Sequence, residues 1–147
     1  MADRVSASIT LGGTITAALY SGLVERIADM ALSTEWDGEP FEAHHRTEGA
    51  ALALFAHEVP GGEFRALEQY CEEHGIAFAR WSGSYPGAFA AERVVFTGNG
   101  EPRSYTADEE DRILIARDTV EALGSFDAVL AYFDEADFEV PPLVVES

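Results

Sequence analysis

The sequence has 147 residues, of which 47% are hydrophobic and 11% aromatic, so it can bury one core of ordinary domain size and lacks the composition of a disordered chain. Its 27 acidic and 9 basic residues give a net charge of −18, and every base is Arg because the sequence contains no Lys. This charge disfavours direct binding to nucleic acid or to an anionic membrane, since both need basic patches on the protein.

Cysteine usage and the N-terminal sequence point to a cytoplasmic protein. Cys71 is the only cysteine and cannot form an internal disulfide, which favours a reducing compartment. The N-terminal stretch MADRVSASIT contains an Asp and no continuous apolar segment, so it does not have the pattern of a secretory signal. No apolar run reaches the roughly 18 residues that a membrane-spanning helix needs.

The first predicted elements are a strand and a helix. Residues 5–11 alternate apolar and hydroxyl side chains, which is typical of a half-buried strand. Gly12-Gly13 predicts a tight turn at the end of this strand. Apolar residues at three- and four-residue spacing then predict an amphipathic helix from Thr14 to about Leu32. The glycine turn is the feature most like a ligand cradle, because its backbone N–H groups could receive an anion.

Residues 41–83 predict a hairpin, a second helix and another strand. FEAHHRT (41–47) and ALALFAHEV (51–59) predict two strands joined at Glu48-Gly49. Residues 61–75 predict a helix capped by its last glycine, and IAFARWSG (76–83) predicts a strand. Over residues 5–82 this gives the βαββαβ order of ferredoxin-like folds. We therefore expect an α+β protein with an antiparallel or mixed sheet and two main helices.

The C-terminal part predicts a hairpin and short helices. Asn99-Gly100 predicts the hairpin turn, because both residues tolerate positive φ. RILIAR (112–117) predicts a short strand, residues 118–123 and 126–137 predict short acidic helices, and the segment after Pro141-Pro142 predicts an edge strand. We expect all 147 residues to form a single domain.

The positions of the histidines argue against a metal site. On a strand, His44 and His45 would point to opposite faces, and His57 would lie roughly 13 Å from the position opposite His44. Cys71 and His74 share a helix but have no further ligands at a zinc-like spacing. We expect neither a metal nor a cofactor.

The sequence also lacks a convincing nucleophile. In SGSYPG, neither Ser82 nor Ser84 has the flanking glycines of a nucleophile elbow. Cys71 lies on the predicted inward face of its helix, which makes it a core residue. We assign no catalytic residue and expect no enzymatic activity.

The acidic residues are concentrated in the last third of the chain. Residues 101–147 contain 13 acids and 3 Arg, against 14 acids and 6 Arg in residues 1–100. Phenylalanines and a tyrosine lie among these acids, although their helical spacing at 126–133 predicts that they pack into the core. The candidate partner-binding carboxylates are Asp108, Glu109, Glu110, Asp111, Asp118, Glu121, Asp127, Asp134, Glu135, Asp137 and Glu139.

These carboxylates favour a non-catalytic acidic binding protein. It would block a positively charged, nucleic-acid-handling partner by acting as a DNA mimic, since charge steers association and nearby rings supply contact area. Anti-restriction and anti-CRISPR inhibitors are specific instances of this class. The sequence does not predict the partner's identity or the oligomeric state.

Two alternatives remain open. In the first, the protein is a soluble accessory domain whose charge serves only solubility, as in a GC-rich or salt-adapted host. In the second, it is a small ligand-binding or enzymatic domain that uses the Gly12-Gly13 turn, with Arg80 or a histidine as the polar anchor.

Overall fold

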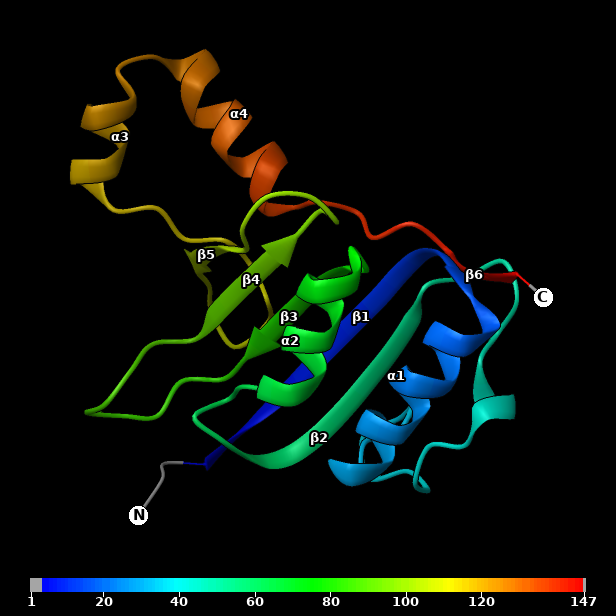
Figure 1. The fold of residues 1–147 in the computed structure, drawn as a ribbon. Coiled ribbons are helices and arrows are strands. Elements are labelled where there is room, and N and C mark those ends of the chain that lie inside the picture. The colour runs from blue at the N-terminus through cyan, green and yellow to red at the C-terminus, as the bar shows by residue number, and fades with distance from the viewer. Residues whose placement is uncertain (1–3, 147) are drawn as a thin grey trace.

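The computed structural model describes residues 4–146 and has an α+β architecture, as predicted (Figure 1). The strands are β1 (Arg4–Thr16), β2 (Leu52–Pro60), β3 (Ala77–Ser82), β4 (Glu92–Phe96), β5 (Arg103–Thr106) and β6 (Leu143–Glu146). The helices are α1 (Ala17–Asp29), α2 (Arg65–His74), α3 (Arg117–Leu123) and α4 (Phe126–Ala136), with a 3-10 turn at Ala43–His45.

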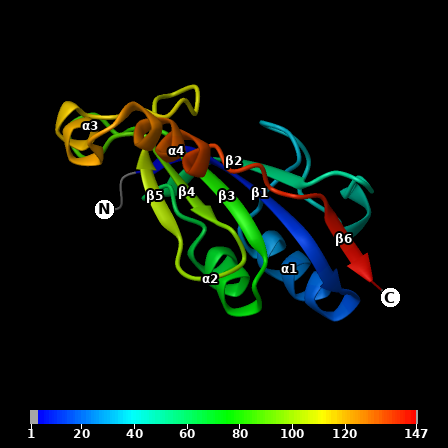
Figure 2. The ribbon, with the colours of Figure 1, turned by 90° about the horizontal axis from the view of Figure 1, so that it is seen from above.

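The strands form one sheet in the order β2-β1-β3-β4-β5, in which all neighbours are antiparallel. The short β6 pairs in parallel with the far end of β1. Figure 2 shows α1 and α2 on one side of the sheet and α4 on the other. None of the described helices has the length and apolar content that crossing a bilayer requires.

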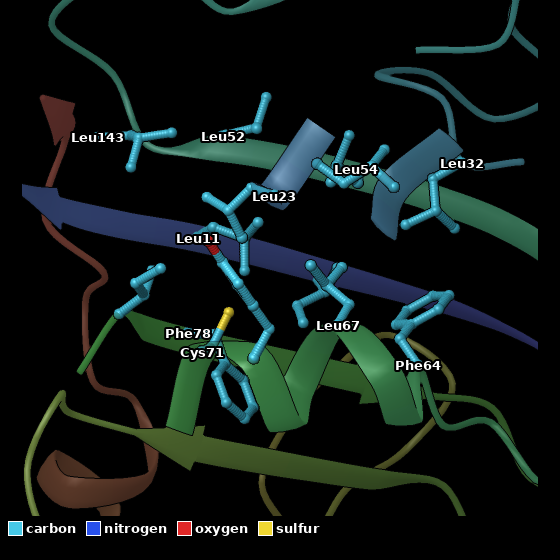
Figure 3. Packing of buried hydrophobic residues seen from close by; sticks show 14 of the residues in the cluster. Leu11, Leu23, Leu32, Leu52, Leu54, Phe64, Leu67, Cys71, Phe78 and Leu143 are labelled. Atoms are coloured by element: carbon cyan, nitrogen blue, oxygen red, sulfur yellow. The ribbon is translucent and has the colours of Figure 1, made fainter. Parts of the chain in front are cut away.

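The main core lies between the sheet and the α1–α2 layer (Figure 3). Alternation along β1 directs Ile9 and Leu11 inward, where they meet Leu23 of α1 and Leu67 of α2. Figure 3 also shows Leu143 of β6 at one end of this core. The helix predicted at 61–75 is confirmed from Arg65 onward, residues 61–64 form a turn that leads into it, and Gly75 ends it in the left-handed conformation.

Cys71 is buried in this core, as predicted. Burial raises the pKa of its thiol to about 12, and only the thiolate reacts readily. We therefore expect Cys71 to react with a thiol reagent such as dithionitrobenzoate more than 100-fold more slowly in the native protein than in urea. Rapid labelling without denaturant would contradict this burial.

The predicted turn at Gly12-Gly13 is wrong. Both glycines lie inside β1, which continues to Thr16, and it is Thr16 rather than Thr14 that caps α1. The strand continues because β6 supplies a new partner where β2 and β3 stop, and the N–H of Gly13 donates to the carbonyl of Pro142. The anion cradle that the second alternative requires is therefore absent at these residues.

The predicted strand at 41–47 is also wrong, so the βαββαβ order is not confirmed. This segment contains the 3-10 turn, because the buried Phe41 and a hydrogen bond from its N–H to Leu32 fold it back against the end of α1. The hydroxyl of Tyr20 donates to the Ala43 carbonyl at 2.6 Å and holds the same turn. The neighbour of β2 is therefore β1. β2 and β3 lie on opposite sides of β1 and both run antiparallel to it.

In the C-terminal part, the β4–β5 hairpin, the two short helices and the final strand are found where the sequence predicts them. The segment RILIAR is not a strand. It makes one isolated bridge, between Ile113 and Ala107, and its other residues lead outward to α3.

Candidate interaction surface

The four consecutive acids form an ordered loop instead of a free acidic patch. The carboxylate of Asp108 accepts hydrogen bonds from the N–H groups of Glu110 and Arg112 and pairs with the Arg112 guanidinium at 2.7 Å. The backbone bond from Arg112 is the main cause that lowers the pKa of Asp108. Glu109 accepts hydrogen bonds from the N–H and the hydroxyl of Ser84. These charges are therefore largely used inside the molecule.

Arg93 on β4 joins this loop to the end of α4. Its guanidinium pairs with Asp111 at 2.9 Å and donates to the carbonyls of Ala136 at 2.6 Å and Phe138 at 3.1 Å. Burial raises the pKa of Asp111 and Arg93 opposes that shift. One Asp111 oxygen is buried without a hydrogen-bond partner among the described residues. Arg93 thus fixes the base of the segment that carries the remaining acids.

That segment, residues 113–138, contains α3 and α4 and is called the arm below. Figures 1 and 2 show α3 lying away from the sheet beyond β5, on the side opposite α1 and α2. α3 has no buried residue, and in α4 only Ala136 is buried. At the base of the arm, a cavity of about 440 Å³ between the hairpin and α4 is lined by Arg103, Tyr105, Glu135 and Phe138 among others.

The outer part of the arm exposes apolar side chains. Phe126, the first residue of α4, has 75% of its surface exposed, and Leu130 one turn later has 46%. Leu114 and Val120 are also exposed. The prediction that residues 126–133 pack into the core is therefore wrong for Phe126 and Leu130. Only the last turn of α4 reaches the sheet, where Ala136 and Tyr132 pack with Tyr105.

Several carboxylates of the arm, and Glu139 just after it, are exposed and take part in no described ion pair. Glu121 pairs with Arg117 and Glu135 pairs with Arg103. Among the described residues, no ion pair involves Asp118, Asp127, Asp134, Asp137 or Glu139, and all five are exposed. The structure therefore separates the predicted carboxylates into two groups: a loop of mostly paired charges, in which Glu109 and Glu110 are exposed, and a set of exposed carboxylates without a described ion-pair partner.

A polar network that the sequence does not predict lies under α2. Arg80 of β3 is 3% exposed and contacts Glu68 of α2 at 3.3 Å, Ser82 at 3.0 Å and Glu92 of β4 at 3.2 Å. Burial raises the pKa of Glu68, although Arg80 and the N–H of Phe64 oppose the shift. Arg80 is thus committed to internal partners and does not act as the anchor of an open ligand site.

Ser6, His57 and Asp37 form a hydrogen-bonded chain on the other face of the sheet. Ser6 Oγ lies 2.9 Å from His57 Nδ1, and His57 Nε2 lies 3.2 Å from Asp37. A bulge where β1 meets β2 brings Ser6 and His57 together. However, the Asp37 side chain is 83% exposed, so water competes for its contact, and Ser6 lines none of the cavities described for the structure. This geometry does not support an acylating serine.

His44 and His45 do not diverge, which corrects the expectation for this pair. They belong to the 3-10 turn, and the centroids of their rings are 4.4 Å apart.

Comparisons with protein-family models, with curated proteins and with solved structures found no match to this chain.

Proposed function

We propose that the protein is an acidic binding protein that blocks a positively charged, nucleic-acid-handling partner, and that it does so through the arm. The observation that carries this proposal is the exposure of Phe126 at the start of α4, in a segment that also contains the exposed carboxylates of Asp118, Asp127 and Asp134, which have no described ion-pair partner. Exposed apolar patches rimmed by polar residues mark sites of protein–protein interaction, and this supports the assignment. An inhibitor of a restriction or CRISPR nuclease that imitates DNA charge is the specific form of this function.

The two kinds of side chain have different roles. Phe126 and Leu130 lie one turn apart on α4, so they can enter a single apolar depression of the partner. Asp118, Asp127 and Asp134 provide negative charge that speeds association with a basic rim. The arm therefore combines apolar anchors with the charge that imitates a phosphate backbone.

The negative charge also disfavours other partners for the arm. A second copy of this chain would bring another −18 toward the same acidic surface, and like charges at an interface are unfavourable. Solubility alone explains the acids but gives no reason for an exposed Phe126. A basic partner with an apolar depression satisfies both features.

The test uses capture from a bacterial lysate that contains defence nucleases, at about 50 mM and then about 500 mM salt, between which the Debye length falls about threefold. We expect wild-type protein to retain a nucleic-acid-binding protein at low salt and to release it at high salt or when duplex DNA is added. The F126A variant should bind that partner at least about 10-fold more weakly, the loss typical of an interface anchor.

Charge-neutralised variants test whether binding depends on the acids of the arm or on the net negative charge of the whole protein. D118N/D127N/D134N should slow association and flatten its salt dependence, whereas E25Q/D29N/E73Q changes the charge equally on exposed positions of α1 and α2 and should bind as wild type does. A partner that DNA does not displace, or equal losses in both triple variants, would argue against the proposal.

A further inference from the structure

We infer that Glu42, His44 and His45 form a binding site for a borderline divalent transition-metal ion, such as zinc. One ligand atom from each of these side chains lies within 4.8 Å of the others. Glu42 Oε2 is 3.8 Å from the Nε2 atoms of both histidines. This site lies between α1 and β2, and its assignment does not depend on the function of the arm.

The distances between the carboxylate and the two imidazoles need little adjustment to hold an ion. Tetrahedral zinc with ligands at about 2.0–2.1 Å places those ligands about 3.3 Å from one another. The two carboxylate contacts must therefore shorten by about half an ångström, which side-chain rotation can supply. His44 is 74% exposed and free to rotate, whereas His45 is partly buried against Phe41.

The turn is held in place from both sides, which lowers the entropy cost of gathering its ligands. Tyr20 of α1 donates to the Ala43 carbonyl, and Phe41 is anchored in the core. Arg46, the nearest cation in sequence, is directed away, since its guanidinium donates to the Leu143 carbonyl and lies over the ring of Tyr20.

The surroundings favour a cation. A neighbouring cavity of about 460 Å³ is lined by Glu35, Asp37, Glu39 and His45. Its carboxylates make the local field negative and can hold water molecules that complete the metal's coordination. Two imidazoles and one carboxylate suit zinc, nickel, cobalt or copper, whereas magnesium and calcium prefer all-oxygen sites.

The hydrogen bonding of His45 predicts a measurable change on binding. The Glu42 N–H donates to Nδ1 of His45 at 3.1 Å, so in the neutral ring Nε2 carries the hydrogen. Coordination through Nε2 requires that hydrogen to move to Nδ1, which breaks the bond to Glu42. Metal binding therefore changes the tautomer of His45, whereas His57 and His74, which are not ligands of this site, keep theirs.

Calorimetric titration of the metal-free protein with zinc chloride tests the site. We expect one equivalent to bind saturably, with affinity at least about 10-fold lower in H44A and in E42Q, by the scale of losing a metal-site contact. H57A/H74A removes the same kind of side chain elsewhere and should bind as wild type does. Because His44 is exposed, H44A is expected to fold normally, and its thermal unfolding without zinc checks this.

Nitrogen chemical shifts of the four histidine rings provide the second measurement. Zinc should move the ring hydrogen of His45 from Nε2 to Nδ1 and leave His57 and His74 unchanged. The inference is overturned if H44A binds zinc as tightly as wild type, if no saturable binding occurs, or if zinc perturbs all the histidines equally. Loss of the arm's partner would leave this result unaffected, so failures of the two proposals are distinguishable.

Discussion

Replacement of Arg80 by Met should lower the free energy of unfolding by about 3–5 kcal/mol, the range for breaking a buried ion pair from one side. Arg80 is nearly inaccessible to solvent, and its guanidinium is the charged partner of Glu68 in the interior. Without it, the Glu68 carboxylate keeps only the N–H of Phe64 as a described hydrogen-bond donor. Urea unfolding followed by circular dichroism measures the loss.

The effect of R80M should depend on pH in a defined direction. Burial raises the pKa of Glu68 above its ordinary value, so its ionisation costs the folded state free energy. The free energy of folding that is linked to protonated Glu68 is fully present at a pH below the pKa of Glu68 in the unfolded chain. It is lost as the pH rises through the pKa of Glu68 in the folded protein. Removing Arg80 raises the folded pKa further, so R80M should lose more stability at pH 7.5 than at pH 5.

Two further variants make this prediction specific. R65M removes an Arg that is exposed and pairs with Glu63 on the surface, so it should cost less than about 1 kcal/mol. The double variant E68L/R80M removes both buried charges and should recover part of the R80M loss. If R80M and R65M cost the same, the network under α2 does not contribute as described.

The second large effect is expected for Gly12→Ala, because the backbone of the C-terminal segment passes directly over Gly12. A Cβ atom at this position would lie 1.8 Å from the carbonyl oxygen of Pro141. A backbone atom cannot rotate away, so β6 must shift and partly expose Leu143, which is now fully buried. We expect a loss of about 2–5 kcal/mol, as for large disruptions of a core leucine.

Hydrogen exchange locates this disruption. In G12A, the amides of Gly13 and Leu143, which donate to the carbonyls of Pro142 and Ala50, should exchange faster than in wild type. G83A is the matched control, because its Cβ would approach the flexible end of the Glu109 side chain at 3.1 Å and would lie at ordinary contact distances of 3.5 Å from the Trp81 ring and 3.6 Å from the Ser6 carbonyl. Equal stability and equal exchange in G12A and wild type would show that the segment does not pass this close.

The sequence predicts the elements that local patterns determine. Alternation identifies the start of β1, and helical spacing with Gly75 identifies α2. The errors arise where contacts with segments distant in the sequence determine the local structure. FEAHHRT alternates like a strand, but burial of Phe41 against α1 leaves it without a strand partner. Likewise, Gly12-Gly13 resembles a turn until β6, more than 120 residues later, covers it.

The same limit applies to the candidate interaction surface. The sequence identifies the acids, but it does not show that Asp111 pairs with Arg93 or that Glu109 binds Ser84. The helical spacing at 126–133 predicts an apolar face correctly. Which surface covers that face depends on where the chain directs α4, so the exposure of Phe126 is visible only in three dimensions.

Because α3 and α4 have almost no buried residues, the residues that stabilise the fold are largely separate from those that form the surface of the arm. Stability depends on the layer formed by α1, α2 and the sheet, whereas the outer turns of the arm contribute little to it. Substitutions there can accumulate without a folding penalty, provided that Arg93 and β6 still fasten the base. Such a division allows the surface of the outer arm to change while the scaffold beneath it stays constant.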